Sequence, residues 1–387
     1  MVKSEADARP QAGAVVPPSE RPPWIVSPGW DAFWILSGLW LWALYAAVSR
    51  FELGMAAFGA LVAGQVIWAT VHSFATTYTV MFSPVFAEAR KERPMRFLGI
   101  PALIFAVSMG LGLYVGIGPK MEDGAGFGLA NWGFALYLAA FFLGHFWHFA
   151  QQDFGVLSLY RTRKAQFRPI DRTVDLVYSR FTTLVVQPIV YLFALYELPW
   201  SELIVSGLPI SHDTARTAAT IAVFASMAAS VGILGFELSK PNRSIPKLYY
   251  LAIIAFHPLT LYYVPDGYGL LYAFVYLFSH WMVAISLAWR VNRNHAVKQA
   301  NPARAIGLYL LAFGGMCLAA CLVHWNLAPR SPLTADDYTG IVGHLGLGAS
   351  LVLGYALGEQ MVHYYCDRAL FSFKDAYVRQ NVGPLLR

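Results

Sequence analysis

Charged residues are scarce in this chain, and their scarcity narrows the class of protein. They make up 13% of the 387 residues, against about 25% in a typical soluble domain. Cysteine is also rare: of the three present, Cys317 and Cys321 lie one helical turn apart in an apolar run, so no disulfide framework is expected. The chain shows no repeat of fixed period and no polar stretch long enough for a separate soluble domain. These absences exclude soluble, disulfide-stapled and repeat proteins.

Long apolar runs take the place of the missing charge. Hydrophobic residues make up 57% of the chain and the mean hydropathy is +0.49. A helix of about 20 apolar residues crosses a ~30 Å hydrocarbon core, and about ten runs approach that length. The sequence therefore predicts an all-α, polytopic transmembrane helical bundle. The predicted spans lie near residues 30–48, 53–81, 97–117, 132–157, 181–198, 215–238, 248–264, 268–289, 305–323 and 340–364.

The connecting loops predict an orientation for this bundle. Basic clusters occur in every second loop, at residues 89–96, 160–172, 240–247 and 289–298, and again in the C-terminal tail. The intervening loops are neutral or acidic. Because basic loops remain on the cytoplasmic side, both termini are expected to be cytoplasmic. The net charge of +6 then reflects topology and not a nucleic-acid partner, and the expected location is a bacterial-type inner or plasma membrane, crossed several times.

The two ends of the chain differ in composition from the middle. Residues 1–28 are rich in Pro, Ala and charge and lack the apolar core of a signal peptide, so a disordered tail is expected. Residues 29–364 form the predicted transmembrane helical domain. Residues 365–387 alternate apolar and charged side chains, as in an amphipathic helix at the cytoplasmic interface. Such a segment would cap a site that lies just below it.

One predicted span carries unusual polarity, in the stretch GHFWHFAQQDFG at residues 144–155. An unpaired polar group costs roughly several kcal/mol in hydrocarbon, so each of these must find a partner. Counted from the nearest cytoplasmic loop at 1.5 Å per residue, ionisable side chains on five spans reach depths of roughly 14 to 20 Å, with His145 one turn deeper and His363 one turn closer to the cytoplasm. The members of this layer, taken as candidate metal ligands, are His72, His145, His148, His257, His280, Glu359 and His363.

Helical geometry predicts that these polar faces point toward one another. His145, His148 and Gln152 fall within a ~60° sector of one helix, and Tyr355, Glu359 and His363 are spaced by four residues along another. Polar faces at one depth are expected to meet inside the bundle because the alternative is lipid. Four neighbouring side chains are expected to support the ligands: Gln152, Asp153, Tyr276 and Tyr355.

A metal site is the favoured interpretation of this layer. Imidazole and carboxylate ligands suit iron, zinc, copper or manganese. The number of candidates exceeds the needs of one catalytic zinc, which favours two ions or one ion with supporting partners. Three alternatives remain: a structural polar core, a proton or solute pathway in a proton-coupled transporter, and a haem held by two histidines. Haem is least favoured because the chain has no CxxCH motif.

The depth of the site indicates what chemistry it would perform. A buried site is accessible to a lipid-soluble substrate and to O₂ from the bilayer, and iron with open positions activates O₂. The histidine layer resembles that of the integral-membrane non-haem iron enzymes of the fatty-acid desaturase and alkane-hydroxylase class. The resemblance implies iron, as one or two ions. Its HxxxH and HxxHH boxes are absent, since the chain has HFWH at residues 145–148 and no HH pair, so no residue role is transferred.

The expected function is that of a membrane-bound oxygenase, hydroxylase or desaturase acting on a lipid-soluble substrate. The lipid bilayer is the expected surroundings of the protein. The basic cytoplasmic loops offer a surface for an acidic electron donor.

Overall fold

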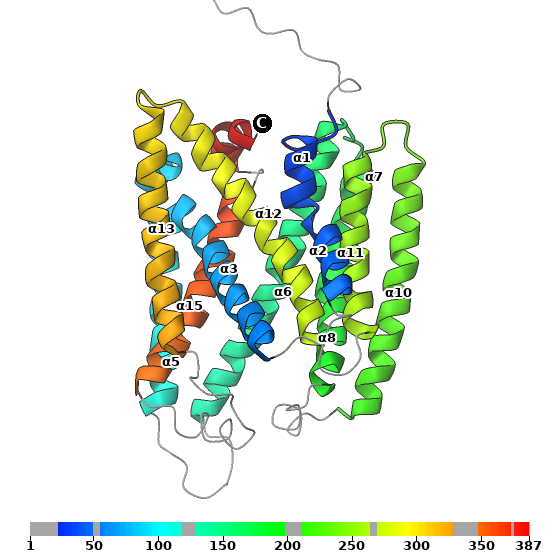
Figure 1. Ribbon diagram of the computed structural model, residues 1–387, viewed down its shortest axis with the longest axis horizontal. Coiled ribbons are helices and arrows are strands. Elements are labelled where there is room, and N and C mark those ends of the chain that lie inside the picture. The colour runs from blue at the N-terminus through cyan, green and yellow to red at the C-terminus, as the bar shows by residue number, and fades with distance from the viewer. Residues whose placement is uncertain are drawn as a thin grey trace, which may run out of the picture.

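The computed structural model describes residues 22–48, 55–117, 129–197, 210–263, 269–327, 347–372 and 375–386. Within these ranges the chain is helical and contains no strand, which confirms the all-α class. The helices lie side by side in a bundle, with α13 at one edge and α10 at the other (Figure 1). The long helices are α2 (Ser37–Val48), α3 (Met55–Met81), α5 (Ile100–Ile117), α6 (Leu129–Arg163), α10 (His212–Leu238), α11 (Ile245–Tyr263), α12 (Gly269–Val297), α13 (Pro302–Leu327) and α15 (Leu347–Leu370).

Shorter helical elements complete the bundle. One continuous helical stretch combines α7 (Pro169–Arg180), the π-helical turn η4 (Phe181–Val186) and α8 (Gln187–Tyr196). This stretch begins at Pro169, before the predicted span at residues 181–198. Arg180 therefore lies within a helical stretch that continues into the apolar residues of that span. The remaining short elements are α1 (Pro28–Trp30), η1 (Asp31–Ile35), η2 (Pro84–Phe86), α4 (Ala87–Glu92), η3 (Met95–Gly99), η5 (Val378–Val382) and η6 (Gly383–Leu386).

Four helical stretches are long and apolar enough to cross a membrane. They are Met95–Tyr114, Pro169–Ala194, His212–Leu238 and Pro302–Cys321. Helical residues overlap each of the predicted spans within the described part of the chain. The total of ten spans and the cytoplasmic location of both termini stay predictions.

The N-terminal segment joins the bundle just before α1. Residues 1–21 of the predicted tail lie outside the described residues, whereas Ile25 is only 1% exposed. Its backbone N–H donates to Oδ2 of Asp31 at 2.7 Å. Oδ2 of Asp31 also accepts a hydrogen bond from Tyr160 of α6. The last residues of the predicted tail therefore pack against the helical domain.

Helices α5 and α15 approach closely along a GxxxG sequence. A Cβ atom at Gly354 would lie 2.9 Å from the backbone oxygen of Ser108, and one at Gly358 would lie 3.0 Å from Cβ of Ser108. Only glycine permits this spacing, and small-xxx-small patterns serve the same purpose in membrane helix pairs. The contact fixes the position of α15, which carries Glu359 and His363.

The C-terminal segment packs against the end of the bundle. Asp375 accepts hydrogen bonds from Arg93 at 3.1 Å and from Arg96 at 2.6 Å. Tyr377 donates its hydroxyl to the backbone oxygen of Val85 at 2.6 Å. Further along, Val382, Leu385 and Leu386 are buried in the main core cluster. This segment is therefore fastened at its start by charge and at its end by apolar packing.

Acidification is expected to loosen this segment. Burial raises the pKa of Asp375, but the hydrogen bonds from Arg96 and from the backbone N–H of Tyr377 outweigh it and hold that pKa below its ordinary value of 3.8. Because the folded-state pKa is the lower one, the stabilisation is complete above 3.8 and is lost as the pH falls through the folded value. The substitution Asp375→Asn should lower the free energy that holds this segment against the bundle by about 1 kcal/mol.

Hydrogen exchange of residues 375–386 measures this effect. At about pH 7 the Asp375→Asn variant should exchange roughly fivefold faster than the wild type. The two rates should converge only below the folded-state pKa of Asp375, because a protonated aspartate resembles asparagine. Comparison at each pH cancels the intrinsic pH dependence of exchange. Equal rates at about pH 7 would show that the two arginines do not hold the segment.

Candidate metal centre

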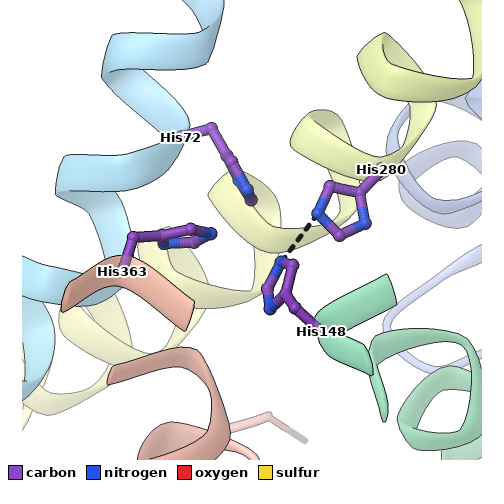
Figure 2. A group of neighbouring side chains, drawn as sticks. All are labelled: His72, His148, His280 and His363. Atoms are coloured by element: carbon purple, nitrogen blue, oxygen red, sulfur yellow. Dashed lines mark hydrogen bonds between the residues drawn. The ribbon is translucent and has the colours of Figure 1, made fainter. Parts of the chain in front are cut away.

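Four histidines from four helices converge inside the bundle. They are His72 of α3, His148 of α6, His280 of α12 and His363 of α15 (Figure 2). Each offers one ring nitrogen, and these four atoms lie within 4.8 Å of one another. None of the four residues is more than 4% exposed. The cluster therefore joins helices that are far apart in the sequence.

The rings contact one another directly. Nε2 of His148 lies 2.9 Å from Nε2 of His280, as the dashed line in Figure 2 shows. The rings of His72 and His363 have centroids 4.2 Å apart. Gln152, one turn after His148, donates to the backbone oxygen of His280 at 2.8 Å. The contact holds α6 against α12 beside the cluster.

Two further side chains lie beside Nδ1 atoms of the imidazole rings. Oγ1 of Thr76 lies 2.8 Å from Nδ1 of His363, and Oδ2 of Asp367 lies 3.5 Å from Nδ1 of His148. A ring that donates its Nδ1–H to such an oxygen keeps a lone pair on Nε2. Carboxylates and hydroxyls behind metal-binding histidines commonly set the tautomer in this way. Neither residue is among the supporting residues predicted from the sequence, although Thr76 follows His72 and Asp367 follows His363 by one turn.

Several ring nitrogens of the cluster have no hydrogen-bond partner within the described part of the chain. Nδ1 of His72, Nδ1 of His280 and Nε2 of His363 are buried there without a hydrogen bond. Such orphaned groups are uncommon in folded proteins and require an explanation. Two nitrogens bound at ~2.1 Å to one ion can be at most ~4.2 Å apart. A contraction of about half an ångström would therefore allow the four histidines to hold a single metal ion.

The other three predicted ligands lie outside this group of four. Nδ1 of His145 lies 2.8 Å from the hydroxyl of Tyr364. His257 stacks on Tyr276, with ring centroids 3.7 Å apart. Glu359 is buried near Ser73 of α3. Their role as ligands stays a prediction.

The predicted supporting residues fall into two places. Gln152 lies beside the cluster, as described above. Asp153 instead accepts hydrogen bonds from Tyr250 and Tyr276, both at 2.8 Å, and so joins α6 to α11 and α12. Tyr355 lies two turns before His363 and packs edge-on against Phe105 of α5, with centroids 5.8 Å apart. Asp153 and Tyr276 thus support the helices that carry the histidines.

Comparison with known proteins adds no family to this description. No protein-family model matches the chain, and neither the curated proteins nor the solved structures contain a significant match. The site is therefore interpreted from its own geometry and chemistry. A buried group of four histidines is able to hold a metal ion, and imidazole nitrogen suits zinc, copper, iron and nickel.

Proposed function

We propose that the chain is a multi-pass, integral-membrane, metal-dependent oxidoreductase that holds one iron ion between His72, His148, His280 and His363. The convergence of these residues within 4.8 Å is the observation that carries the proposal. The four helical stretches long and apolar enough to cross a membrane support its location in a bilayer. A bacterial-type inner or plasma membrane is the proposed setting.

The number of histidines favours iron over zinc. Four imidazoles complete the tetrahedral shell of a zinc ion and leave no position for a substrate or water. An ion that accepts five or six ligands keeps open positions with the same four residues, as non-haem iron does in oxygenases. When bound, such an ion supplies activation of O₂, which the protein side chains cannot provide.

The chain's own residues would position the ion and exclude water. Thr76 and Asp367 turn the rings of His363 and His148 toward the centre. Phe149 covers one side of His280, with ring centroids 4.1 Å apart. Asp367 also places a carboxylate near an otherwise neutral ligand set, which offsets the charge of a buried cation.

The proposed substrate is lipid-soluble and the proposed electron donor is cytoplasmic. The basic loop at residues 289–298 offers exposed cations, among them Arg293 and Lys298. An acidic donor protein is complementary to such a surface. The surrounding bilayer is the source of the substrate.

Metal analysis with nitric oxide as a spectroscopic probe tests the proposal. Protein purified in a mild nonionic detergent should contain about one equivalent of iron. Nitric oxide added without air should produce the electron paramagnetic resonance signal of high-spin ferrous nitrosyl, because the ion keeps an open position. Absence of any stoichiometric transition metal would contradict the proposal. A tightly bound zinc ion that accepts no further ligand would favour a structural site, and pH-dependent solute flux by metal-free protein in liposomes would favour a transporter.

A further inference from the structure

A large cavity leads to one side of the histidine cluster. It has a volume of about 1040 Å³ and lies among α6, α7 and α15. Its inner wall includes His148, Gln152 and Asp367, so it adjoins the proposed metal centre. Cavities of roughly 300 to 1,000 Å³ bind small organic ligands. The cavity is therefore large enough for a substrate.

The cavity wall carries an excess of positive charge. Among the described residues that line it, Asp367 is the one acidic residue, and it is buried beside His148. Basic residues are more numerous than acidic ones in this wall. The arginines that line the cavity are Arg161, Arg163, Arg172, Arg180, Arg368 and Arg379. Arg161 is neutralised by Asp175 at 3.1 Å. Arg172, Arg180, Arg368 and Arg379 leave the wall electropositive.

Two of these arginines follow one face of α7. Arg172 and Arg180 lie eight residues apart with Leu176 between them, and all three line the cavity. The guanidinium of Arg180 lies 5.2 Å from the centroid of Trp147, and that of Arg172 lies 5.7 Å from Phe154. Within the described ranges neither arginine forms an ion pair with a carboxylate. Aromatic rings and cations thus alternate along this wall.

The position of Arg180 makes an anionic partner valuable. It lies inside the candidate span Pro169–Ala194, roughly 17 Å from the start of the helix at 1.5 Å per residue. A charged arginine at the centre of a span costs about 2.5 to 3.5 kcal/mol or more, and such residues face a cavity and bind a counter-charge. A carboxylate or phosphate group in the cavity would supply that charge bidentately.

Two buried acceptor oxygens on the cavity wall have no hydrogen bond within the described residues. They are Oε1 of Gln152 and Oδ1 of Asp367, and as acceptors they are complementary to a hydrogen-bond donor and not to an anion. Their residues are 5% and 3% exposed. The wall also includes apolar side chains such as Leu176, Met361 and Phe371. The lining therefore suits a molecule that combines an apolar chain with a charged group.

We infer that this cavity binds a single-chain amphiphile with an anionic headgroup, a carboxylate or a phosphate. The headgroup binds Arg180, and Arg172, about 12 Å away along α7 at 1.5 Å per residue, adds to the positive charge of the wall. The apolar chain lies against Trp147 and Met361 toward His148. The inference rests on the proposed function in naming this molecule as the substrate of the metal centre. The anion-binding site itself does not require the metal.

Tryptophan quenching by brominated amphiphiles tests the inference. The protein is reconstituted in nanodiscs of zwitterionic phosphatidylcholine and titrated with 12-bromododecanoate, 12-bromododecyl phosphate or 12-bromododecanol. At least one anionic probe should bind about tenfold more tightly than the alcohol, and comparison of the two anions identifies the headgroup. The variant Arg172→Gln/Arg180→Gln should lose this preference, whereas Arg304→Gln, an exposed arginine outside the cavity, should keep it.

Three outcomes would overturn the inference. They are equal affinity for the alcohol and both anions, an unchanged preference in the double variant, and full competition by inorganic phosphate, which would indicate a site for a free anion. The same titration of His280→Ala protein separates the two proposals, because His280 does not line the cavity. If the metal-free variant still prefers the anionic probes, the anion-binding site is supported even where the proposal of a metal centre is contradicted.

Discussion

Alanine in place of His72, His148, His280 or His363 is expected to reduce bound metal below about a tenth of an equivalent, whereas His145→Ala and His257→Ala retain it. The four residues converge within 4.8 Å, so each removal deletes one of four ligands. Loss of a mere supporting contact already costs about 10- to 100-fold in metal affinity. Loss of a ligand should cost more. Elemental analysis of each purified variant by mass spectrometry measures the outcome.

His145 and His257 are closely matched controls. Both lie inside the bundle in the same predicted layer, and both have aromatic partners, Tyr364 for His145 and Tyr276 for His257. Their removal creates a comparable cavity without deleting a member of the group of four. Thermal unfolding and gel filtration of every variant separate loss of metal from loss of fold. If metal persisted in the four ligand variants, the centre would be refuted. Equal loss in His145→Ala and His257→Ala would instead support the wider set of seven.

The depth of each histidine along its helix was predictable from the sequence. The direction in which its side chain points was predictable only in part. Each residue adds 1.5 Å to a helix, so counting from the basic loops placed His72, His148, His280 and His363 in one layer. The direction in which a ring points also depends on how each helix packs against its neighbours. His145 is only three residues from His148, yet its ring faces Tyr364. Its role could not be read from spacing alone.

Helix ends explain the residues that the sequence interpretation missed. The last predicted span stops at residue 364 because charged residues follow, but α15 continues to Leu370. Asp367 therefore lies on the same helix as His363 and reaches His148. In the same way, the predicted span at 181–198 omitted Arg180, which the helix from Pro169 places beside Trp147. A hydropathy pattern ends a predicted span at the first charged residues. The helix itself continues past them for as long as its backbone hydrogen bonds are formed.

Basic loop residues also have a role that topology rules do not describe. The sequence predicts residues 160–172 and 240–247 to be orientation signals in cytoplasmic loops. Lys240 and Lys247 are instead 3% and 1% exposed. Nζ of Lys240 lies 3.1 Å from Asp171 and 2.7 Å from Glu237. The charges of these two lysines are neutralised in a buried ionic cluster that joins α7, α10 and α11.

Lys247→Met is expected to destabilise the fold by about 3 to 5 kcal/mol, the usual cost of removing one partner from a buried ion pair. Its Nζ lies 2.8 Å from Asp175 and 3.0 Å from Glu237. Without it, three buried carboxylates, Asp171, Asp175 and Glu237, share two buried counter-charges within the described residues, Arg161 and Lys240. Equilibrium unfolding in nonionic detergent, followed by tryptophan fluorescence, measures the change.

Lys91→Met is the matched control, because the Lys91–Glu88 pair has the same chemistry at the surface, where both side chains are more than 60% exposed. An exposed pair contributes about 0 to 1 kcal/mol, so this variant should remain close to the wild type. Adding Asp175→Asn to Lys247→Met removes one uncompensated carboxylate and should restore part of the stability. Equal stability of the two lysine variants would show that the cluster does not hold α7 in place. A large difference between the two variants would show that the cluster holds α7 in place. Lys247 would then stabilise, from a distance, the helix on which Arg172 and Arg180 face the cavity.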